Sequence, residues 1–367
     1  MTTGPEPLLD IRDLSVEYRL SRRETLRAVH GVDLDVHAGE TVGLVGESGS
    51  GKSTIGRAVL GLTPPASGSI RFDGQEIAGL RGRQRARLAR DLQVVFQDPL
   101  SSLNPSMKVG DLLQEPIRVV RRISRGEAAE IAGDLLERVS LPRDAASRYP
   151  GAFSGGQRQR IAIARALSID ARLIVCDESV SALDVSTQAS ILSLLRRLQR
   201  ELGVAYLFVS HDIAVVRNVS RRVVVLYKGR VMERGPTAEI VDRPYHPYTR
   251  TLLDAIPIPD PRGQRERRAR RLASRVRSPG GTAAGGAAGA GCPFAARCAF
   301  VQDVCRTRAP VPIPIGARQV ACHMYDPASG HPRAGEIATG GWDDPLAREP
   351  GPAPDRQPAG TTRHDGG

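Results

Sequence analysis

The sequence is poor in aromatic residues, in cysteine and in long apolar runs. Phe, Trp and Tyr make up 4% of its 367 residues, with a single Trp. This low content argues against a protein that stacks the bases of single-stranded nucleic acid. No stretch approaches the roughly 20 uninterrupted apolar residues that span a bilayer, and the first residues lack the pattern of a secretory signal. We therefore expect a cytoplasmic protein whose five cysteines do not form structural disulfides.

Negative charge is also in the minority. The chain has 52 Lys and Arg against 40 Asp and Glu, a formal net charge of +12. Such an excess suits nucleic acid, an anionic membrane surface or a phosphorylated ligand, and charge alone does not choose among them. Because aromatic residues are scarce, we expect no nucleic-acid partner. The hydrophobic fraction of 40% is enough for a sizeable core.

Changes in composition divide the chain into four parts. Residues 1–260 alternate short apolar runs with helix-like stretches, which predicts an α/β domain with a mainly parallel sheet covered on both faces. Residues 261–291 are rich in Arg and then in Gly and Ala, as linkers are. Residues 292–325 hold four of the five cysteines, and residues 326–367 have the composition of a disordered tail.

The strongest local signal is a phosphate-binding P-loop. The pattern G-x-x-x-x-G-K-[ST] is matched in full after the apolar run 41–45 and before a helix-like stretch. Glycines let backbone N–H groups curl around phosphates, and the helix N-terminus favours negative charge. Lys52 would contact the β- and γ-phosphates and Ser53 would ligate Mg²⁺. The predicted nucleotide site comprises Gly46, Glu47, Ser48, Gly49, Ser50, Gly51, Lys52, Ser53 and Thr54.

A second apolar run, residues 173–176, ends in two acidic residues. A P-loop enzyme needs a further carboxylate for its metal, and Asp177 is placed to supply it, directly or through water. Glu178 is then placed to polarise an attacking water as general base. Together these residues predict hydrolysis of a nucleoside triphosphate.

The segment between these two elements resembles the signature motif of ABC ATPases. It begins at Phe153, where the family usually has Leu, and continues with Ser154, Gly155, Gly156 and Gln157. Ser154 can cap the next helix, and the two glycines leave its first N–H groups open to an anion. In the family, two cassettes pair head to tail, and each signature closes over the ATP of the other. The resemblance therefore implies an ABC nucleotide-binding domain with antiparallel β and helical subdomains, which must dimerise for turnover.

Further motifs of the family follow in the expected order. Tyr18 is similar to the aromatic residue that stacks on adenine, and Gln97 to the glutamine that touches Mg²⁺ and senses the membrane partner. His211 resembles the switch histidine that holds the γ-phosphate. One departure is Ser179, where the family mostly has a stiffer Pro. The D-loop, which crosses the dimer interface, is matched by Ser181, Ala182, Leu183 and Asp184. The resemblance thus assigns catalysis to Glu178, His211, Gln97 and Lys52.

Three stretches narrow the resemblance to the ATPases of oligopeptide, dipeptide and nickel importers. They are QDPLSSLNP (97–105), RPYHPYTRTLLDAIP (243–257) and GCPFAARC…C…VACH (291–323). Together with the signature segment, they make the chain most similar to the second, F-type ATPase of such systems. This implies an ATPase at the cytoplasmic face of the cell membrane that powers peptide import. Its partners are a second ABC ATPase, two transmembrane permease subunits and an extracytoplasmic solute-binding protein. The alternatives are import of nickel or another non-peptide solute, and a soluble ABC ATPase without a transport role.

The cysteines near the C-terminus predict a metal centre. Their spacing is C-x5-C-x6-C-x16-C, and four thiolates suffice for a [4Fe–4S] cluster or a tetrahedral zinc. Zinc sites usually contain close C-x2–4-C pairs, which are missing here, and the resembled family carries an iron–sulfur cluster in this region. We therefore favour the cluster over zinc or free thiols, and expect the metal to provide the fold of this apolar-poor segment. The predicted ligands are Cys292, Cys298, Cys305 and Cys322.

Overall fold

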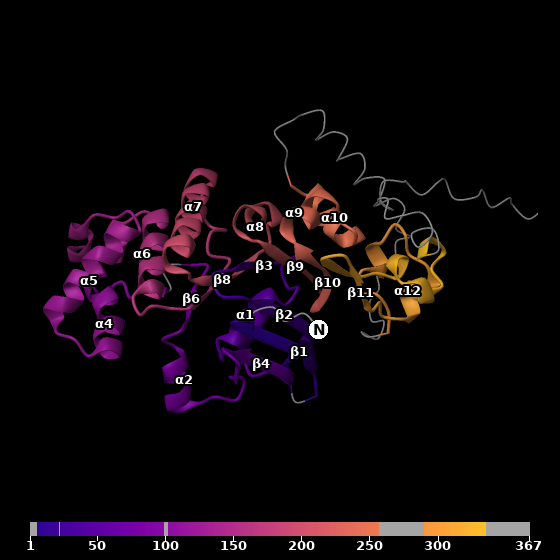
Figure 1. The fold of residues 1–367 in the computed structure, drawn as a ribbon, viewed down its shortest axis with the longest axis horizontal. Helices are drawn as coiled ribbons and strands as arrows, with labels where there is room; N and C mark the ends of the chain where they lie inside the picture. Colours follow the sequence, from indigo (N-terminus) through magenta and orange to yellow (C-terminus); the bar gives the residue numbers. More distant parts are fainter. Residues whose placement is uncertain (1–5, 22, 99–101, 257–289, 335–367) are drawn as a thin grey trace, which may run out of the picture.

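The computed structural model describes residues 6–21, 23–98, 102–256 and 290–334. Most of the predicted linker, and the tail from residue 335 onward, lie outside the described residues. Within them, the main sheet has eight strands in the order β11-β12-β10-β9-β3-β8-β7-β6 (Figure 1). Five neighbouring strands, from β9 to the edge strand β6, are parallel, as predicted. They are β3 (Thr41–Val45), β6 (Leu92–Val95), β7 (Leu173–Asp177), β8 (Ala205–Ser210) and β9 (Arg222–Tyr227).

The alternation of side chains along these buried strands divides the core between the two faces of the sheet. In β8, Tyr206 and Phe208 pack with the helices on one face, whereas Leu207 packs in a second cluster on the other face. The second cluster contains helix α1 (Lys52–Val59), whose Ile55 and Val59 are fully buried. Burial of each such side chain is worth about 1.5–3 kcal/mol. This packing fixes the start of α1 against the edge of β3.

An antiparallel sheet covers the outer side of α1. Its order is β2-β1-β4-β5. The strands are β1 (Leu9–Arg19), β2 (Thr25–Val36), β4 (Ser67–Phe72) and β5 (Gln75–Glu76), followed by the exposed helix α2 (Gly82–Leu88). The predicted antiparallel subdomain is thus present, and it encloses α1 between two sheets.

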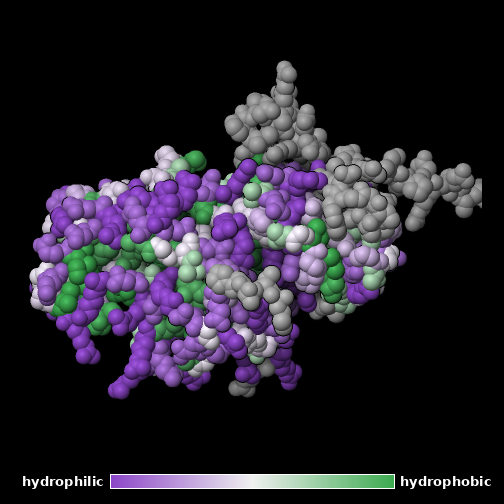
Figure 2. All heavy atoms as spheres, viewed as in Figure 1, coloured by the Kyte–Doolittle hydropathy of each residue, from purple (hydrophilic) through white to green (hydrophobic). Residues whose placement is uncertain are grey.

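The helical region lies at one end of the molecule (Figure 1). It contains α4 (Val109–Arg121), α5 (Arg125–Arg138) and α6 (Gly155–Leu167), with 3-10 turns at Arg143–Ser147 and Pro150–Ala152. Ser124 begins α5 with a reciprocal capping box to Glu127, and α7 (Val185–Leu202) packs beside α6. Figure 2 shows a largely polar surface on which apolar side chains gather over the region of α4 and α5. No helix in the described ranges has the length and apolar character needed to cross a membrane.

The C-terminal extension, residues 290–334, is built onto the main sheet. Its strands β11 (Pro312–Ile315) and β12 (Arg318–Ala321) continue the sheet beyond β10 (Arg230–Pro236), with Glu233 paired to Val320. The extension also contains α12 (Asp303–Thr307) and 3-10 turns at Ala295–Arg297, His323–Tyr325 and Pro327–Ser329. The main domain ends with three helices, α8 (Ile213–Val219), α9 (Thr237–Asp242) and α10 (Pro247–Asp254).

This construction corrects two expectations about the extension. A small core of its own, which includes Val320, Met324 and Tyr325, packs against Tyr245 of the main domain. Apolar packing and strand pairing therefore hold the segment, and a metal is not needed to explain its fold. The folded part also continues past the predicted start of the tail at residue 326, because His331 and Ala334 are buried.

Candidate functional site

The P-loop lies between β3 and α1, at the carboxyl edge of the parallel strands. Gly46, Gly49 and Gly51 all have positive φ, at 156°, 77° and 99°. A Cβ at Gly46 would lie 2.1 Å from the carbonyl oxygen of Leu226, so a larger residue does not fit there. The backbone angle favours glycine at all three positions, and the available space also requires it at Gly46 and Gly51.

Lys52 lies inside the loop. It is 3% exposed, and its Nζ donates hydrogen bonds to the carbonyl oxygens of Gly46, at 2.8 Å, and Glu47, at 2.9 Å. Burial lowers the pKa of Lys52, and the carboxylates of Glu178, Asp177 and Glu47 act in the opposite direction. The loop thus holds a cation at its centre, where a phosphate group would meet it.

The two acidic residues at the end of β7, Asp177 and Glu178, lie beside this loop. The Ser53 hydroxyl donates a hydrogen bond to Asp177 Oδ1 at 2.8 Å, which joins the start of α1 to the end of β7. The Glu178 carboxylate lies 3.4 Å from His211 Nδ1. Glu178 has a φ of 48°, in the left-handed region, and its N–H donates to the carbonyl oxygen of Val209 on β8. The structure therefore brings Ser53, Asp177, Glu178 and His211 together, as their motifs predict.

Tyr18 and Gln97 lie at two sides of the same site. The Tyr18 hydroxyl donates to Thr54 Oγ1 at 3.3 Å, so the end of β1 reaches the first turn of α1. Gln97 is exposed and follows β6, which pairs in parallel with β7 through Val95 and Cys176. Both Gln97 and Asp177 therefore extend from the same edge of the sheet.

The signature segment does not join this cluster within one chain. Ser154 begins α6 with a reciprocal capping box to Gln157, and its hydroxyl accepts from the Gln157 N–H. A Cβ at Gly156 would lie 2.4 Å from a methyl carbon of Thr187, next to the D-loop. Among the described residues, no hydrogen bond or ion pair links the signature to the P-loop. The exposed N–H groups of α6 are therefore available to a ligand held by another molecule.

The D-loop forms a turn between β7 and α7. The N–H and hydroxyl of Ser181 both donate to the carbonyl oxygen of Glu178, at 3.1 and 2.9 Å. Asp184 caps α7, and its hydrogen bonds with Ser186 and Thr187 hold the pKa of its carboxyl well below the usual range. Ser181, Ala182 and Asp184 are exposed, and Leu183 is half-buried. The D-loop thus connects the backbone of Glu178 directly to an accessible surface.

The four C-terminal cysteines line one small cavity of about 10 Å³. Burial raises the pKa of the Cys292 thiol to about 11 and that of Cys298 to about 12, and raises that of Cys322 as well. Within the described part of the chain, no group of three or more His, Cys, Asp or Glu side chains is arranged to hold a metal ion. The structure thus brings the four predicted ligands to one cavity, but their side chains are not arranged as a metal site.

Two residues that reach the P-loop were not found from the sequence. Tyr248, in α10, accepts a hydrogen bond from the Glu47 N–H at 2.9 Å. Arg297, in the C-terminal extension, forms an ion pair with the Glu47 carboxylate at 2.9 Å. Neither belongs to a phosphate-binding pattern, and both are more than 200 positions from Glu47. The RPYHPYTR and GCPFAARC stretches, which contain Tyr248 and Arg297, stood out in the sequence, but nothing in them pointed to the nucleotide site.

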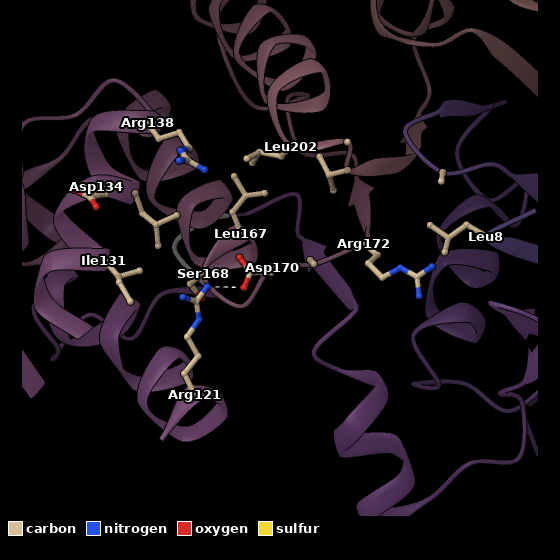
Figure 3. Close-up of a pocket in the computed structure, with 15 residues that line it drawn as sticks. Leu8, Arg121, Ile131, Asp134, Arg138, Leu167, Ser168, Asp170, Arg172 and Leu202 are labelled. Atoms are coloured by element: carbon tan, nitrogen blue, oxygen red, sulfur yellow. Dashed lines mark hydrogen bonds and ion pairs between the residues drawn. The ribbon is translucent and has the colours of Figure 1, made fainter. Parts of the chain in front are cut away.

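A cavity beside the helical region is a separate feature. It has a volume of about 390 Å³ and lies where β3 and β8 begin, lined by residues such as Leu8, Ala38 and Val204 (Figure 3). The P-loop follows β3, so this cavity lies at the opposite edge of the sheet. Its Arg121 pairs with Asp170, as the dashed line in Figure 3 marks. We assign it no part in the nucleotide site.

Comparison with known proteins agrees with this geometry. Residues 29–181 match the ABC transporter family model, and residues 232–305 match the oligopeptide/dipeptide transporter C-terminal region. A protein of Brucella ovis, provisionally named a peptide import ATP-binding protein, is 48% identical over 304 residues, 83% of this chain and 93% of its own. A protein of Brucella abortus with the same provisional description is 46% identical over 329 residues, 88% of this chain and 95% of its own.

Solved structures give the same fold. The cbiO1 protein of Clostridium perfringens, part of an ABC transporter complex, superposes with a TM-score of 0.58 at 27% identity, over 65% of this chain and 91% of that one. A dimeric ATP-binding cassette bound to ADP and Pi has a TM-score of 0.57 at 30% identity, over 62% and 98% of the chains. The chain therefore belongs to the ATP-binding proteins of ABC transporters, with the C-terminal region of the oligopeptide/dipeptide branch.

Proposed function

We propose that this protein is the ATP-hydrolysing subunit of an ABC importer for di- or oligopeptides. The observation that carries the proposal is the pairing of one complete P-loop site with an oligopeptide/dipeptide transporter C-terminal region on the same fold. Relatives described as peptide import ATP-binding proteins, which match over more than four fifths of the chain, support it.

In the proposed reaction, the chain's own groups hold the phosphates and orient a water. Lys52 exchanges its bonds to the Gly46 and Glu47 carbonyls for bonds to the β- and γ-phosphates. Glu178 accepts a proton from the attacking water, and His211, 3.4 Å away, orients the carboxylate and binds the γ-phosphate. Tyr18 stacks on adenine, at the side of the site marked by its contact with Thr54.

The metal partner of ATP fits the oxygen atoms present. The Ser53 hydroxyl and the Asp177 carboxylate, 2.8 Å apart, are hard oxygen ligands of the kind that Mg²⁺ prefers. Gln97 extends from the same edge and would supply a third oxygen to a bound Mg²⁺. When bound, Mg²⁺ neutralises charge that develops on the phosphates.

Turnover requires two cassettes in this proposal. The signature residues Ser154, Gly155, Gly156 and Gln157 make no bond to the P-loop of their own chain, and their helix N-terminus is exposed. A head-to-tail dimer brings this N-terminus to the γ-phosphate held by the partner ATPase. The exposed D-loop then connects Glu178 to the dimer interface.

A role in peptide import also requires membrane subunits and a solute-binding protein as partners. Two permease subunits hold this chain at the cytoplasmic face of the membrane, and an extracytoplasmic solute-binding protein delivers the peptide. The apolar surface over α4 and α5 suits a contact with such subunits (Figure 2). No feature favours the alternatives, a soluble ABC ATPase or an importer of nickel or another non-peptide solute.

We further infer that Cys292, Cys298, Cys305 and Cys322 hold a [4Fe–4S] cluster, with zinc as the alternative. Support comes from the chemistry of four thiols that line one cavity, although that cavity must widen to accept either metal. Protein purified without oxygen should be brown and contain about four irons per chain. A colourless preparation with one zinc and no iron would contradict the cluster while leaving the ATPase untouched.

The transport proposal is tested by purifying the intact membrane complex through a tag on this chain. We expect two permeases, a second ATPase and a solute-binding protein to co-purify, and the binding protein to retain di- or oligopeptides. Its bound solute can be identified by mass spectrometry. Recovery of the chain with soluble partners alone, or with a binding protein that selects nickel and not peptides, would refute peptide import.

A further inference from the structure

The C-terminal extension reaches directly into the nucleotide site. Arg297 Nη1 lies 2.9 Å from Glu47 Oε2 and 3.4 Å from the Tyr227 hydroxyl. Its guanidinium also lies 5.7 Å from the ring centroid of Tyr227 and 5.4 Å from that of Phe294. The planar cation is therefore held between two rings and a carboxylate, which defines its position more closely than an ion pair alone.

The backbone of Glu47 is held from the same side. Tyr248 is fully buried, and its hydroxyl oxygen accepts the Glu47 N–H at 2.9 Å. Its ring packs against Tyr227, with centroids 4.5 Å apart, and against Phe294 at 5.4 Å. Arg297 and Tyr248 therefore belong to one aromatic cluster that holds both the side chain and the N–H of Glu47.

The position of Glu47 gives this contact a consequence for ATP. Its carbonyl oxygen accepts from Lys52, the residue that binds phosphates in a P-loop. Its carboxylate, on the loop itself, repels an incoming triphosphate unless it is neutralised. Because the side chains of Glu47 and Arg297 are 41% and 44% exposed, their ion pair adds little to the stability of the fold. We therefore expect the ion pair to affect nucleotide binding at the P-loop.

We propose that Arg297 is a positioning residue of the nucleotide site, which acts through Glu47 and makes ATP affinity depend on the C-terminal extension. This inference rests on the proposed binding of ATP at the P-loop. The 3-10 turn that carries Arg297 is tied to two cysteines: the Ala295 N–H donates to the Cys292 carbonyl, and the Cys298 N–H donates to the Ala295 carbonyl. A change in packing around the cysteine cavity therefore moves Arg297 relative to the P-loop.

The test is a titration of the full-length protein with a fluorescent ATP analogue and Mg²⁺. Arg297→Ala should weaken binding about fivefold, the factor that corresponds to about 1 kcal/mol. Arg306→Ala removes the same charge from an exposed position on α12 of the same extension and should leave affinity unchanged. Arg297→Lys should recover part of the loss. In steady-state assays, Arg297→Ala should raise KM and leave kcat within about twofold.

A double variant distinguishes a positioning role of Arg297 from a general disturbance of the fold. In a Glu47→Gln protein the charge to be neutralised is gone, so the further change Arg297→Ala should have little effect on affinity. Equal loss in both backgrounds, or equal affinity of the Arg297→Ala and Arg306→Ala proteins, would overturn the inference. Thermal melting checks that each variant folds. If Arg297→Ala does not fold, the Arg297→Lys protein is used for the same comparison. If the parent protein binds no ATP analogue, the proposed function fails instead.

Discussion

The change Glu178→Gln tests the proposed general base with little disturbance of the fold. The backbone of Glu178 is left-handed, with a φ of 48°, and two hydrogen bonds hold it in place. Its N–H donates to the carbonyl oxygen of Val209, and its carbonyl oxygen accepts from the Ser181 N–H. Gln has the same size and leaves these backbone bonds in place. The change removes the negative charge that lies 3.4 Å from His211, and with it the ability to accept a proton from water.

The expected loss of turnover is large. A positioned general base contributes about 10²–10⁴-fold in rate, which equals about 2.7–5.4 kcal/mol at 1.36 kcal/mol for each factor of ten. ATP binding should persist, because Lys52 and Ser53 are untouched and one negative charge near the phosphates is removed. The Glu178→Gln protein should therefore bind MgATP as tightly as the parent or more tightly, and accumulate as the closed dimer.

The assay measures phosphate release at saturating MgATP, together with nucleotide binding and dimer formation by size-exclusion chromatography. Glu201→Gln is the matched control, because Glu201 is an exposed residue of α7 whose ion pair with Arg197 is 3.5 Å long. This control should keep the parent rate within about twofold, as expected for a surface pair. A Glu178→Gln protein that turns over ATP within about threefold of the parent rate would refute the assignment of the base.

Three further predictions use other residues. Lys52→Ala should weaken nucleotide binding itself at least tenfold, measured by titration, since the loop loses its buried cation; unchanged affinity would contradict its role. Ser154→Arg, mixed with a wild-type partner ATPase, should abolish hydrolysis of the ATP held by the partner, and loss confined to the site of its own P-loop would contradict head-to-tail pairing. Glu233→Gln should lower the free energy of unfolding by about 1–3 kcal/mol in chemical denaturation. The two buried carboxylate oxygens accept from the N–H groups of Tyr245 and His246, and Gln replaces one of these oxygens with an NH₂ group, which can only donate. A change below about 0.3 kcal/mol would refute this role.

The grouping of the candidate site residues could be predicted because their motifs are local in sequence. The P-loop requires glycines at fixed offsets from Lys52, and the backbone angles of Gly46 and Gly51 supply the reason. Asp177 and Glu178 directly follow a buried strand, and parallel strands bring their carboxyl ends to one edge. The contacts of Ser53 with Asp177 and of Glu178 with His211 follow from that topology.

The C-terminal extension could not be predicted in the same way. Strands β11 and β12 have only four residues each, and β11 contains Pro312 and Pro314, which argue against a strand in the sequence. Their place in the sheet depends on pairing with β10, some 85 positions earlier along the chain. The apolar composition of the extension also did not reveal its small core, because that core is completed by Tyr245 of the main domain.

One residue of β10 shows why this extension is part of the ATPase domain. Glu233 pairs with Val320 of β12 through its backbone, and its carboxylate binds the N–H groups of Tyr245 and His246. Burial raises the pKa of Glu233, and these two bonds act against that rise and favour its ionised form. The turn that they fix starts α10, where Tyr248 reaches the N–H of Glu47. The edge of the sheet, this turn and the P-loop are therefore one connected unit, and the extension adds both an edge strand and Arg297 to it.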